Sequence, residues 1–224
     1  MRRDTRFAGD VSHELRSPLT TMANAAAVLE NRRDELSGTA RRALDLLTGE
    51  VERFQRMVVD LLEISRDDPG RAAPDGDDAE VLDLAELVAA VTALRAGPAP
   101  AVEAAGPVPV RGDRRRLDRV VVNLLENADR YGGGPVRVAV TRSGGRARIE
   151  VDDAGPGVPE ELREQVFERF TRGSRAGRRG DDTGSGLGLA LVALHVDRHG
   201  GSVHVEDRPG GGARFVVDLP EARP

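Results

Sequence analysis

The chain has 224 residues, enough for one large domain or two modest domains that each bury a core. Its formal net charge of -5 argues against nonspecific attraction to nucleic acid, and the lack of cysteine excludes disulfides, thiolate metal sites and cysteine nucleophiles. No apolar run approaches the roughly 20 residues of a membrane span, and residues 1–6 lack the apolar core of a signal peptide. We therefore expect a soluble, cytoplasmic chain.

Two helices open the chain, predicted at residues 5–32 and 39–66 with a joint between Asn31 and Gly38. An antiparallel hairpin of this kind leaves most of its apolar seam exposed, so we expect two copies to form a four-helix bundle. A monomeric hairpin packed on the rest of the chain is the alternative. The first helix carries apolar residues within about 80° of one another: Leu15, Leu19, Met22, Ala26 and Leu29. The second has a heptad seam: Leu44, Leu47, Val51, Phe54, Val58 and Leu61.

His13 does not share the apolar face of the first helix, since it lies roughly 200° around the axis from Val11. Glu14 follows it directly. A carboxylate beside an outward imidazole favours a reactive histidine over a packed one. Pro18 removes one N–H from the helix, which predicts a bend just after His13.

A breaker-rich, polar segment at residues 67–79 has the composition of a linker and predicts a domain boundary. Beyond it, helical patterns alternate with short β-branched runs, which indicates an α/β sandwich with one sheet covered by helices. The predicted helices are 83–94, 114–130 and 187–199, and the predicted strands are 136–140, 147–151, 203–205 and 214–217.

The helix at 114–130 carries a second polar constellation. Asn123 and Asn127 lie four residues apart on one face, with Arg130 and Tyr131 one turn further on. An amide oxygen suits Mg²⁺ beside phosphate oxygens, a guanidinium pairs with phosphate, and a phenol ring stacks on a base. An amphipathic helix with an ordinary polar outer face is the alternative.

Two glycine-rich turns follow this helix. Asp153 comes directly after a predicted strand, and its carboxylate could accept a hydrogen bond from an adenine amino group. The second turn opens a helix, where free N–H groups and the positive end of the dipole suit phosphates. Arginines among small residues between the turns indicate a nucleotide lid, with a solvated loop as the alternative. The residues are Gly155 and Gly157 in the first turn, Gly184, Gly186, Leu187, Gly188 and Leu189 in the second, and Arg172, Arg175, Arg178 and Arg179 between them.

In their order and spacing these motifs resemble the sensor histidine kinases of bacterial two-component systems. Residues 13–19 resemble the H box of that family, 123–131 its N box, and 167–170 its F box. Residues 153–157 and 184–189 resemble its two glycine boxes. The resemblance implies a multidomain α and α+β fold, in which a helical hairpin forms a dimeric four-helix bundle and is followed by an α/β sandwich ATP-binding domain of the Bergerat type.

The resemblance also implies an activity, which is ATP-dependent phosphorylation of His13 and transfer of the phosphoryl group to an aspartate in the receiver domain of a response regulator. It assigns Glu14 as the acid–base partner of His13. Ser17 stands where the family usually has Thr or Asn to position water for dephosphorylation of the regulator, so we expect that activity to be retained but weak. The resemblance assigns Asn127 to Mg²⁺. The residues it places around ATP are Asn123, Asn127, Arg130, Tyr131, Asp153, Gly155, Gly157, Arg172, Gly184, Gly186, Leu187, Gly188 and Leu189.

The expected domains are a dimerisation and phosphotransfer domain at residues 1–66, a linker at 67–79 and a catalytic ATP-binding domain at 80–224. Family members usually carry an upstream sensor and a membrane span. We therefore expect either the cytoplasmic core of a longer sensor at the plasma membrane or a kinase whose sensor is a separate polypeptide, with no membrane contact of its own.

Two other functions fit parts of the pattern. One is a dimeric scaffold that binds ATP and signals by conformation or acts mainly as a phosphatase. The other is an ATP hydrolase of the same fold, but the gyrase-like and Hsp90-like hydrolases carry glutamate where this chain has Asn123. Without that carboxylate we expect poor hydrolysis of ATP.

Overall fold

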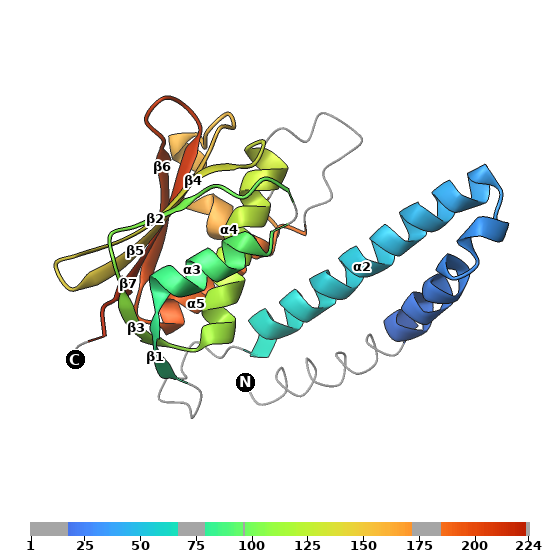
Figure 1. Cartoon of the computed structure of the whole chain (residues 1–224), viewed down its shortest axis with the longest axis horizontal. Helices are drawn as coiled ribbons and strands as arrows, with labels where there is room; N and C mark the ends of the chain where they lie inside the picture. Colours follow the sequence, from blue (N-terminus) through green and yellow to red (C-terminus); the bar gives the residue numbers. More distant parts are fainter. Residues whose placement is uncertain (1–17, 67–78, 96, 172–184, 223–224) are drawn as a thin grey trace. The chain divides into compact units, whose positions relative to one another are not determined.

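The computed structural model of the chain describes residues 18–66, 79–95, 97–171 and 185–222 (Figure 1). The chain divides into two compact units, Met1–Gly70 and Arg71–Pro224. The start of the predicted first helix and the predicted bend before Pro18 lie outside the described residues. Within the described ranges, no helix is both long enough and apolar enough to cross a membrane.

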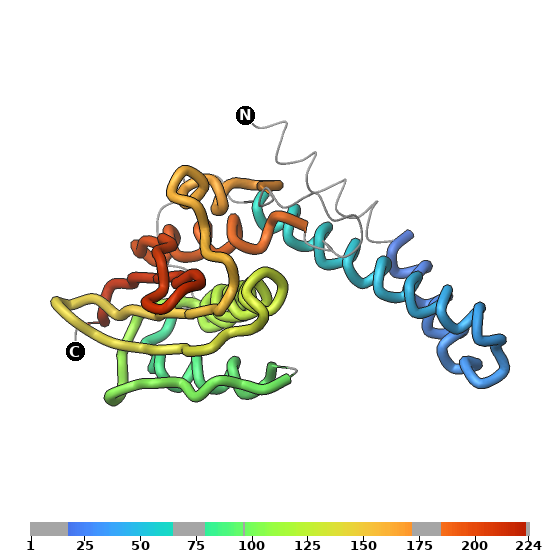
Figure 2. The backbone as a smooth tube through the Cα atoms, turned by 90° about the horizontal axis from the view of Figure 1, so that it is seen from above, coloured from blue at the N-terminus to red at the C-terminus, as the bar shows by residue number. Residues whose placement is uncertain are grey.

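The first unit is a helical hairpin, as predicted. Residues 18–30 are helical, η1 (Arg33–Glu35) forms the joint, and α2 (Gly38–Arg66) returns along the first segment. Figures 1 and 2 both show residues 18–30, in blue, lying alongside α2, in cyan. The segment ends at residue 30 rather than 32, because residues 31 and 32 form the turn that leads into η1.

An ion-pair cluster holds the joint of the hairpin. The Arg33 guanidinium donates from Nη1 to Asp45 Oδ1 at 2.6 Å and from Nη2 to Asp45 Oδ2 at 3.2 Å. The same Nη1 also lies 2.8 Å from Glu30 Oε1. Hydrogen bonds to these two carboxylates raise the pKa of Arg33. Because all three side chains are exposed, the cluster fixes the geometry of the turn more than it adds stability.

The heptad seam of α2 is only half covered within the hairpin. Leu44, Val51 and Val58 are buried. In contrast, Leu47 and Phe54, on the other half of the seam, are 49% and 46% exposed. The facing segment shows the same division, since Leu19 and Ala26 are buried while Met22 and Leu29 are exposed. The side chains on one side of the seam are therefore buried within one hairpin, and those on the other side are exposed.

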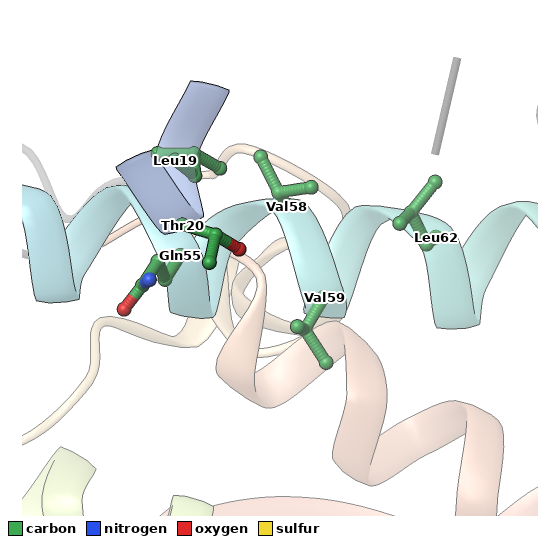
Figure 3. Close-up of a pocket in the computed structure, with 6 residues that line it drawn as sticks. All are labelled: Leu19, Thr20, Gln55, Val58, Val59 and Leu62. Atoms are coloured by element: carbon green, nitrogen blue, oxygen red, sulfur yellow. The ribbon is translucent and has the colours of Figure 1, made fainter. Parts of the chain in front are cut away.

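A groove of about 260 Å³ runs between the two helices (Figure 3). The side chains of Leu19, Val58 and Leu62 in its wall form the buried cluster that joins residues 18–30 to α2. Thr20, Gln55 and Val59 complete the lining.

The second unit contains the three helices that the sequence predicts. They are α3 (Leu84–Ala93), α4 (Arg114–Tyr131) and α5 (Gly188–Arg198), and Figure 1 shows them on the same side of a sheet. The first two begin at aspartate caps. Asp83 Oδ1 accepts from the N–H of Ala85, and Asp113 Oδ1 accepts from the N–H groups of Arg115 and Arg116, which satisfies donors that lack helical partners.

The main sheet has five strands in the order β2-β4-β5-β7-β6, and all its neighbours are antiparallel except β2 and β4. Figure 2 follows β4 into β5 as a hairpin, drawn in yellow. Each of the four predicted strands is present, with longer bounds. The main-sheet strands are β2 (Val102–Ala104), β4 (Pro135–Ser143), β5 (Arg146–Asp153), β6 (Ser202–Asp207) and β7 (Ala213–Pro220).

The predicted sandwich with a helix-covered sheet is confirmed, but the sequence analysis missed a second, smaller sheet. A second sheet of two antiparallel strands pairs β1 (Glu80–Asp83) with β3 (Pro109–Gly112). These strands and β2 are three or four residues long, too short to show a period of two in the sequence. Two short 3₁₀ segments follow, η2 (Glu160–Leu162) and η3 (Gln165–Phe167), and the second ends at the first residue of the F box motif.

The two faces of the main sheet differ in chemistry. The inner face supplies Val138, Ile149, Val151 and Phe215 to a single core that also contains the buried faces of α3, α4 and α5. Because successive strand residues point to opposite faces, the outer face carries the alternating polar positions of β4, β5 and β7. Arginine and carboxylate side chains pair across the strands there.

Candidate functional site

Residues 13–17 of the H box lie outside the described residues, so the structure gives no positions for His13, Glu14 and Ser17. The same holds for Arg172 and Gly184, and for the other arginines of the predicted lid. The remaining predicted site residues all lie in the second unit, on α4, at the end of β5 and in the turn after it, and immediately before and at the start of α5.

Asn123 and Asn127 are half-buried on the same face of α4, beside the apolar stripe that packs into the core. The Nδ2 atom of Asn123 is buried and has no hydrogen-bond partner among the described residues. A buried amide without a partner is uncommon because it loses its bond to water without replacement. Asn123 therefore has a donor available for a ligand.

The start of α5 packs directly on Asn123. A Cβ atom added at Gly188 would lie 3.1 Å from Asn123 Oδ1, so the glycine allows the close approach of the two helices. The preceding residue, Leu187, begins α5 without a side-chain cap. Its carbonyl accepts the first helical bond, from the N–H of Leu191. The N–H groups of residues 188–190 therefore have no bond within the helix and are available to phosphate oxygens.

A hydrogen bond joins the F box to the second glycine box. The N–H of Phe170 donates to the carbonyl of Gly186 at 2.9 Å. Gly186 has φ +69°, and a Cβ there would lie 3.0 Å from Phe170 Cα, so this position combines a glycine backbone with a tight contact. The bond brings together the two described ends of the chain on either side of residues 172–184.

Asp153 is the most tightly held of the predicted ligand-binding residues in the described chain. Its carboxylate is buried, and Oδ1 accepts from the N–H of Gly155 at 2.8 Å and from the N–H of Ala213 at 3.0 Å. Both bonds use the same oxygen, so Oδ2 is the atom left for an outside donor. Oδ2 lies over Gly132, where an added Cβ would be 2.8 Å from it.

Two glycines that the sequence analysis missed make room for Asp153. A Cβ at Gly132 would lie 2.3 Å from Asp153 Cβ, and one at Gly212 would lie 2.0 Å from the Asp153 carbonyl oxygen. Both belong to runs of three glycines, at 132–134 and 210–212. Such runs indicate that another part of the chain packs closely against the backbone. The sequence does not show that the two runs meet at one residue.

The remaining predicted residues are placed as follows. Arg130 and Tyr131 are exposed at the end of α4, and Gly157 has φ +77° in the turn after β5. Leu187 is fully buried and Leu189 packs against the core, so only their backbone atoms are suited to contact a ligand.

The helix α4 connects all these parts. Asn123 touches Gly188, while at the other end the carbonyl of Gly132 accepts from the N–H of Ala154 at 3.2 Å. Nine residues separate the two contacts, which is about 13 Å along a helix. The arrangement therefore suits an extended ligand whose phosphates lie near Asn123 and whose base lies near Asp153.

These parts fit ATP and a divalent cation. The buried Asn123 amide and the free N–H groups of α5 offer donors to phosphate, and Asp153 Oδ2 offers an acceptor to an amino group. The half-buried Asn127 offers a hard, neutral oxygen of the kind that Mg²⁺ accepts beside phosphate.

Comparison with known proteins agrees with this geometry. Residues 3–70 match the family model of the His Kinase A (phospho-acceptor) domain. Residues 112–223 match the model of the histidine kinase-, DNA gyrase B- and HSP90-like ATPase.

Single relatives and solved structures give the same result. The signal transduction histidine-protein kinase AfsQ2 of Streptomyces coelicolor is 37% identical over 226 residues, which cover 96% of this chain and 42% of that protein. The crystal structure of full-length ShkA with AMPPNP superposes with a TM-score of 0.78 at 28% identity, covering 98% of this chain and 46% of that one. The ATP-binding domain of PrrB from Mycobacterium tuberculosis is 33% identical with a TM-score of 0.53, covering 66% of this chain and all of that domain.

The chain thus spans less than half the length of AfsQ2 and of ShkA. Both parts of the matched architecture are nevertheless present in order, a helical phospho-acceptor region and an α/β sandwich with the ATPase motifs. The chain belongs to the histidine kinases, with a phospho-acceptor domain followed by an ATP-binding domain of the type shared with DNA gyrase B and HSP90.

Proposed function

We propose that this chain transfers the γ-phosphoryl group of ATP to His13 and then passes it to an aspartate in the receiver domain of a response regulator. The observation that carries the proposal is that α4 places Gly188 against Asn123 and, nine residues further on, Gly132 against Asp153, in a chain whose N-terminal part matches a phospho-acceptor domain. The bound AMPPNP of ShkA supports a nucleotide as the ligand.

Within the nucleotide site, each residue has a proposed role. Asp153 Oδ2 accepts from the adenine amino group, because Oδ1 is already used by two backbone donors. The N–H groups at the start of α5 bind phosphate, together with Asn123 and the exposed Arg130, while Tyr131 packs beside the nucleotide. Mg²⁺, held by Asn127, would neutralise charge on the phosphates during transfer.

His13 and Glu14 supply the acceptor chemistry. The Glu14 carboxylate accepts a hydrogen bond from the N–H of the His13 ring, which leaves the other ring nitrogen unprotonated as the nucleophile. That nitrogen forms a bond to the γ-phosphorus while the bond to the bridging oxygen breaks. ADP leaves with the electron pair and the ring proton passes to Glu14. The reaction ends with phosphohistidine and ADP.

Asn123 distinguishes this activity from ATP hydrolysis. Its side chain occupies the position where the related hydrolases carry glutamate, and an amide cannot take a proton from water. We infer that ATP persists at the site until His13 reaches it. Ser17 retains a hydroxyl for positioning water during dephosphorylation of the regulator, and we propose that this reverse activity is weak.

We further propose that the chain is a homodimer. The open half of the α2 seam, with Leu47 and Phe54 about half exposed, is the surface that a second hairpin would cover in a four-helix bundle. In this arrangement residues 1–66 would dimerise and carry the phosphoryl group, 67–79 would link the domains, and 80–224 would bind ATP. Because ATP is the phosphoryl donor, we place the chain in the cytoplasm.

Incubation with γ-labelled ATP tests the activity. We expect an acid-labile label on the wild-type chain that His13→Ala abolishes. His204→Ala is the matched control, because His204 is an exposed histidine on β6 with no place in the site, and it should label normally. A wild-type chain that binds ATP without acquiring label would favour the scaffold, and stoichiometric excess of free phosphate would favour the hydrolase.

A further inference from the structure

Two arginine–aspartate pairs bridge the same two strands on the outer face of the main sheet. Near one end of the strands, Arg214 of β7 donates to Asp152 of β5 through Nε at 2.7 Å and Nη2 at 2.9 Å. Four residues away along β5, Arg148 donates to Asp218 of β7 at 2.8 and 3.1 Å. Each pair joins residues directly opposite in the register. The two pairs are thus chemically alike and roughly 13 Å apart along the sheet.

Their positions relative to the nucleotide site differ. The β5–β7 ladder ends at the Asp152–Arg214 pair, and Asp153 is the next residue along β5. Strand alternation points Asp152 outward and Asp153 inward, so the two carboxylates lie on opposite faces of one short backbone segment. The residue next to Arg214, Ala213, donates its N–H to Asp153 Oδ1.

The Asp152 carboxylate is also unusually enclosed for the outer face. Its side chain is only 3% exposed, beneath Arg214, which is itself 18% exposed. Arg137 lies 3.7 Å away on the other side, and it bonds Glu150 and Glu103 as well. Hydrogen bonding to Asp152 raises the pKa of Arg214. A charge this enclosed depends on its partner, because water cannot replace the lost contact.

We propose that the Asp152–Arg214 pair positions Asp153 for recognition of adenine. The bidentate pair fixes the last rung of the β5–β7 ladder, which in turn sets both the Asp153 backbone and the Ala213 N–H that orients its carboxylate. Arg214 and Asp152 are positioning residues, since neither side chain faces the inner side where the nucleotide binds. The inference rests on the proposed binding of ATP by this chain.

The test compares the two pairs in the full chain. Arg214→Lys and Asp152→Asn remove the bidentate geometry near the site, and Arg148→Lys and Asp218→Asn remove it at the far end. Equilibrium titration with ATP and with GTP, both with Mg²⁺, gives the affinity and the preference for adenine. Thermal unfolding of each variant measures the structural cost separately.

We expect Arg214→Lys and Asp152→Asn to weaken ATP binding about five- to tenfold, the effect of one displaced hydrogen bond, and to leave GTP binding unchanged. The double variant should lose no more than either single one, because both act through one pair. Arg148→Lys and Asp218→Asn should lower the unfolding temperature less, because the side chain of Arg148 is 44% exposed, and should retain wild-type ATP affinity.

Two results would overturn the inference. One is wild-type adenine preference in Arg214→Lys, and the other is an equal loss of ATP and GTP binding in all four variants, which would show a general structural effect. A wild-type chain that binds neither nucleotide would instead refute the proposed function itself, so the two failures are distinguishable.

Discussion

Replacing Gly132 with alanine tests the nucleotide site at its tightest contact. The added Cβ would lie 2.3 Å from Asp153 Cβ and 2.4 Å from Asp153 Cγ, whereas carbon atoms in van der Waals contact are about 3.5–4.0 Å apart. Either Asp153 or the end of α4 must therefore move by roughly an ångström. The backbone at Gly132 has φ -107°, which alanine adopts readily, so the effect is purely steric.

The expected cost has two parts. Overpacking of this kind typically destabilises a fold by about 1–3 kcal/mol. Displacement of Asp153 removes its bond to adenine as well, and we expect ATP affinity to fall at least tenfold, about 1.4 kcal/mol. Chemical denaturation measures the first effect, and titration with ATP and Mg²⁺, at a temperature where the variant is folded, measures the second.

The neighbouring glycine provides the control. Gly133 has φ +71° and open space around its Cβ position, so Gly133→Ala strains the backbone by about 1 kcal/mol without pushing on Asp153. It should lose stability and keep wild-type ATP affinity. If Gly132→Ala bound ATP as tightly as the wild type, Asp153 would not be the adenine acceptor, or its position would not depend on this contact.

Three further predictions concern the rest of the chain. Phe54→Ser places a hydroxyl on the open half of the α2 seam and should shift the chain from dimer to monomer in analytical ultracentrifugation; an unchanged dimer would exclude this surface as the interface. Mixed dimers of His13→Ala with Asn127→Ala should acquire label from γ-labelled ATP, on the Asn127→Ala polypeptide that retains His13, if transfer crosses between subunits; mixed dimers that stay unlabelled would show that transfer occurs within one subunit. His199 is buried and accepts from the N–H of Asp113 through Nε2, so burial holds its pKa below the ordinary 6.5. Its contribution to stability is therefore complete above pH 6.5 and is lost as the pH falls below that value, and urea unfolding at pH 7.5 and 5.5 should show a smaller difference for His199→Gln than for the wild type; an equal difference would assign the pH dependence to other groups.

The elements that the sequence predicted well are those whose signal is local. The helix α4 begins at an aspartate cap and carries an apolar stripe with a period of 3.6, and both features lie within 20 residues. The same local pattern placed Asn123 and Asn127 on one face, which the structure shows. The heptad seam of α2 likewise predicted a hairpin, and the family models and relatives confirm the kinase architecture that the ordered motifs indicated.

The sequence failed where a contact joins residues that lie far apart in the chain. Gly212 makes room for Asp153 although the two residues are 59 positions apart in the sequence, and Arg214 pairs with Asp152 at a separation of 62 positions. Both contacts depend on the register between β5 and β7, which no local pattern specifies. The short strands β1, β2 and β3 were missed for a related reason, since pairing with distant strands, not their own composition, makes them strands.

The sequence by itself determined which chemical groups are present, in what order, and on which helical faces, because helix periodicity and turn residues act over a few positions. Only the tertiary structure decided how those groups meet: Gly188 against Asn123, two glycine runs around Asp153, and a strand ladder that ends one residue before it. Those contacts arise from packing and strand register, which depend on the whole domain.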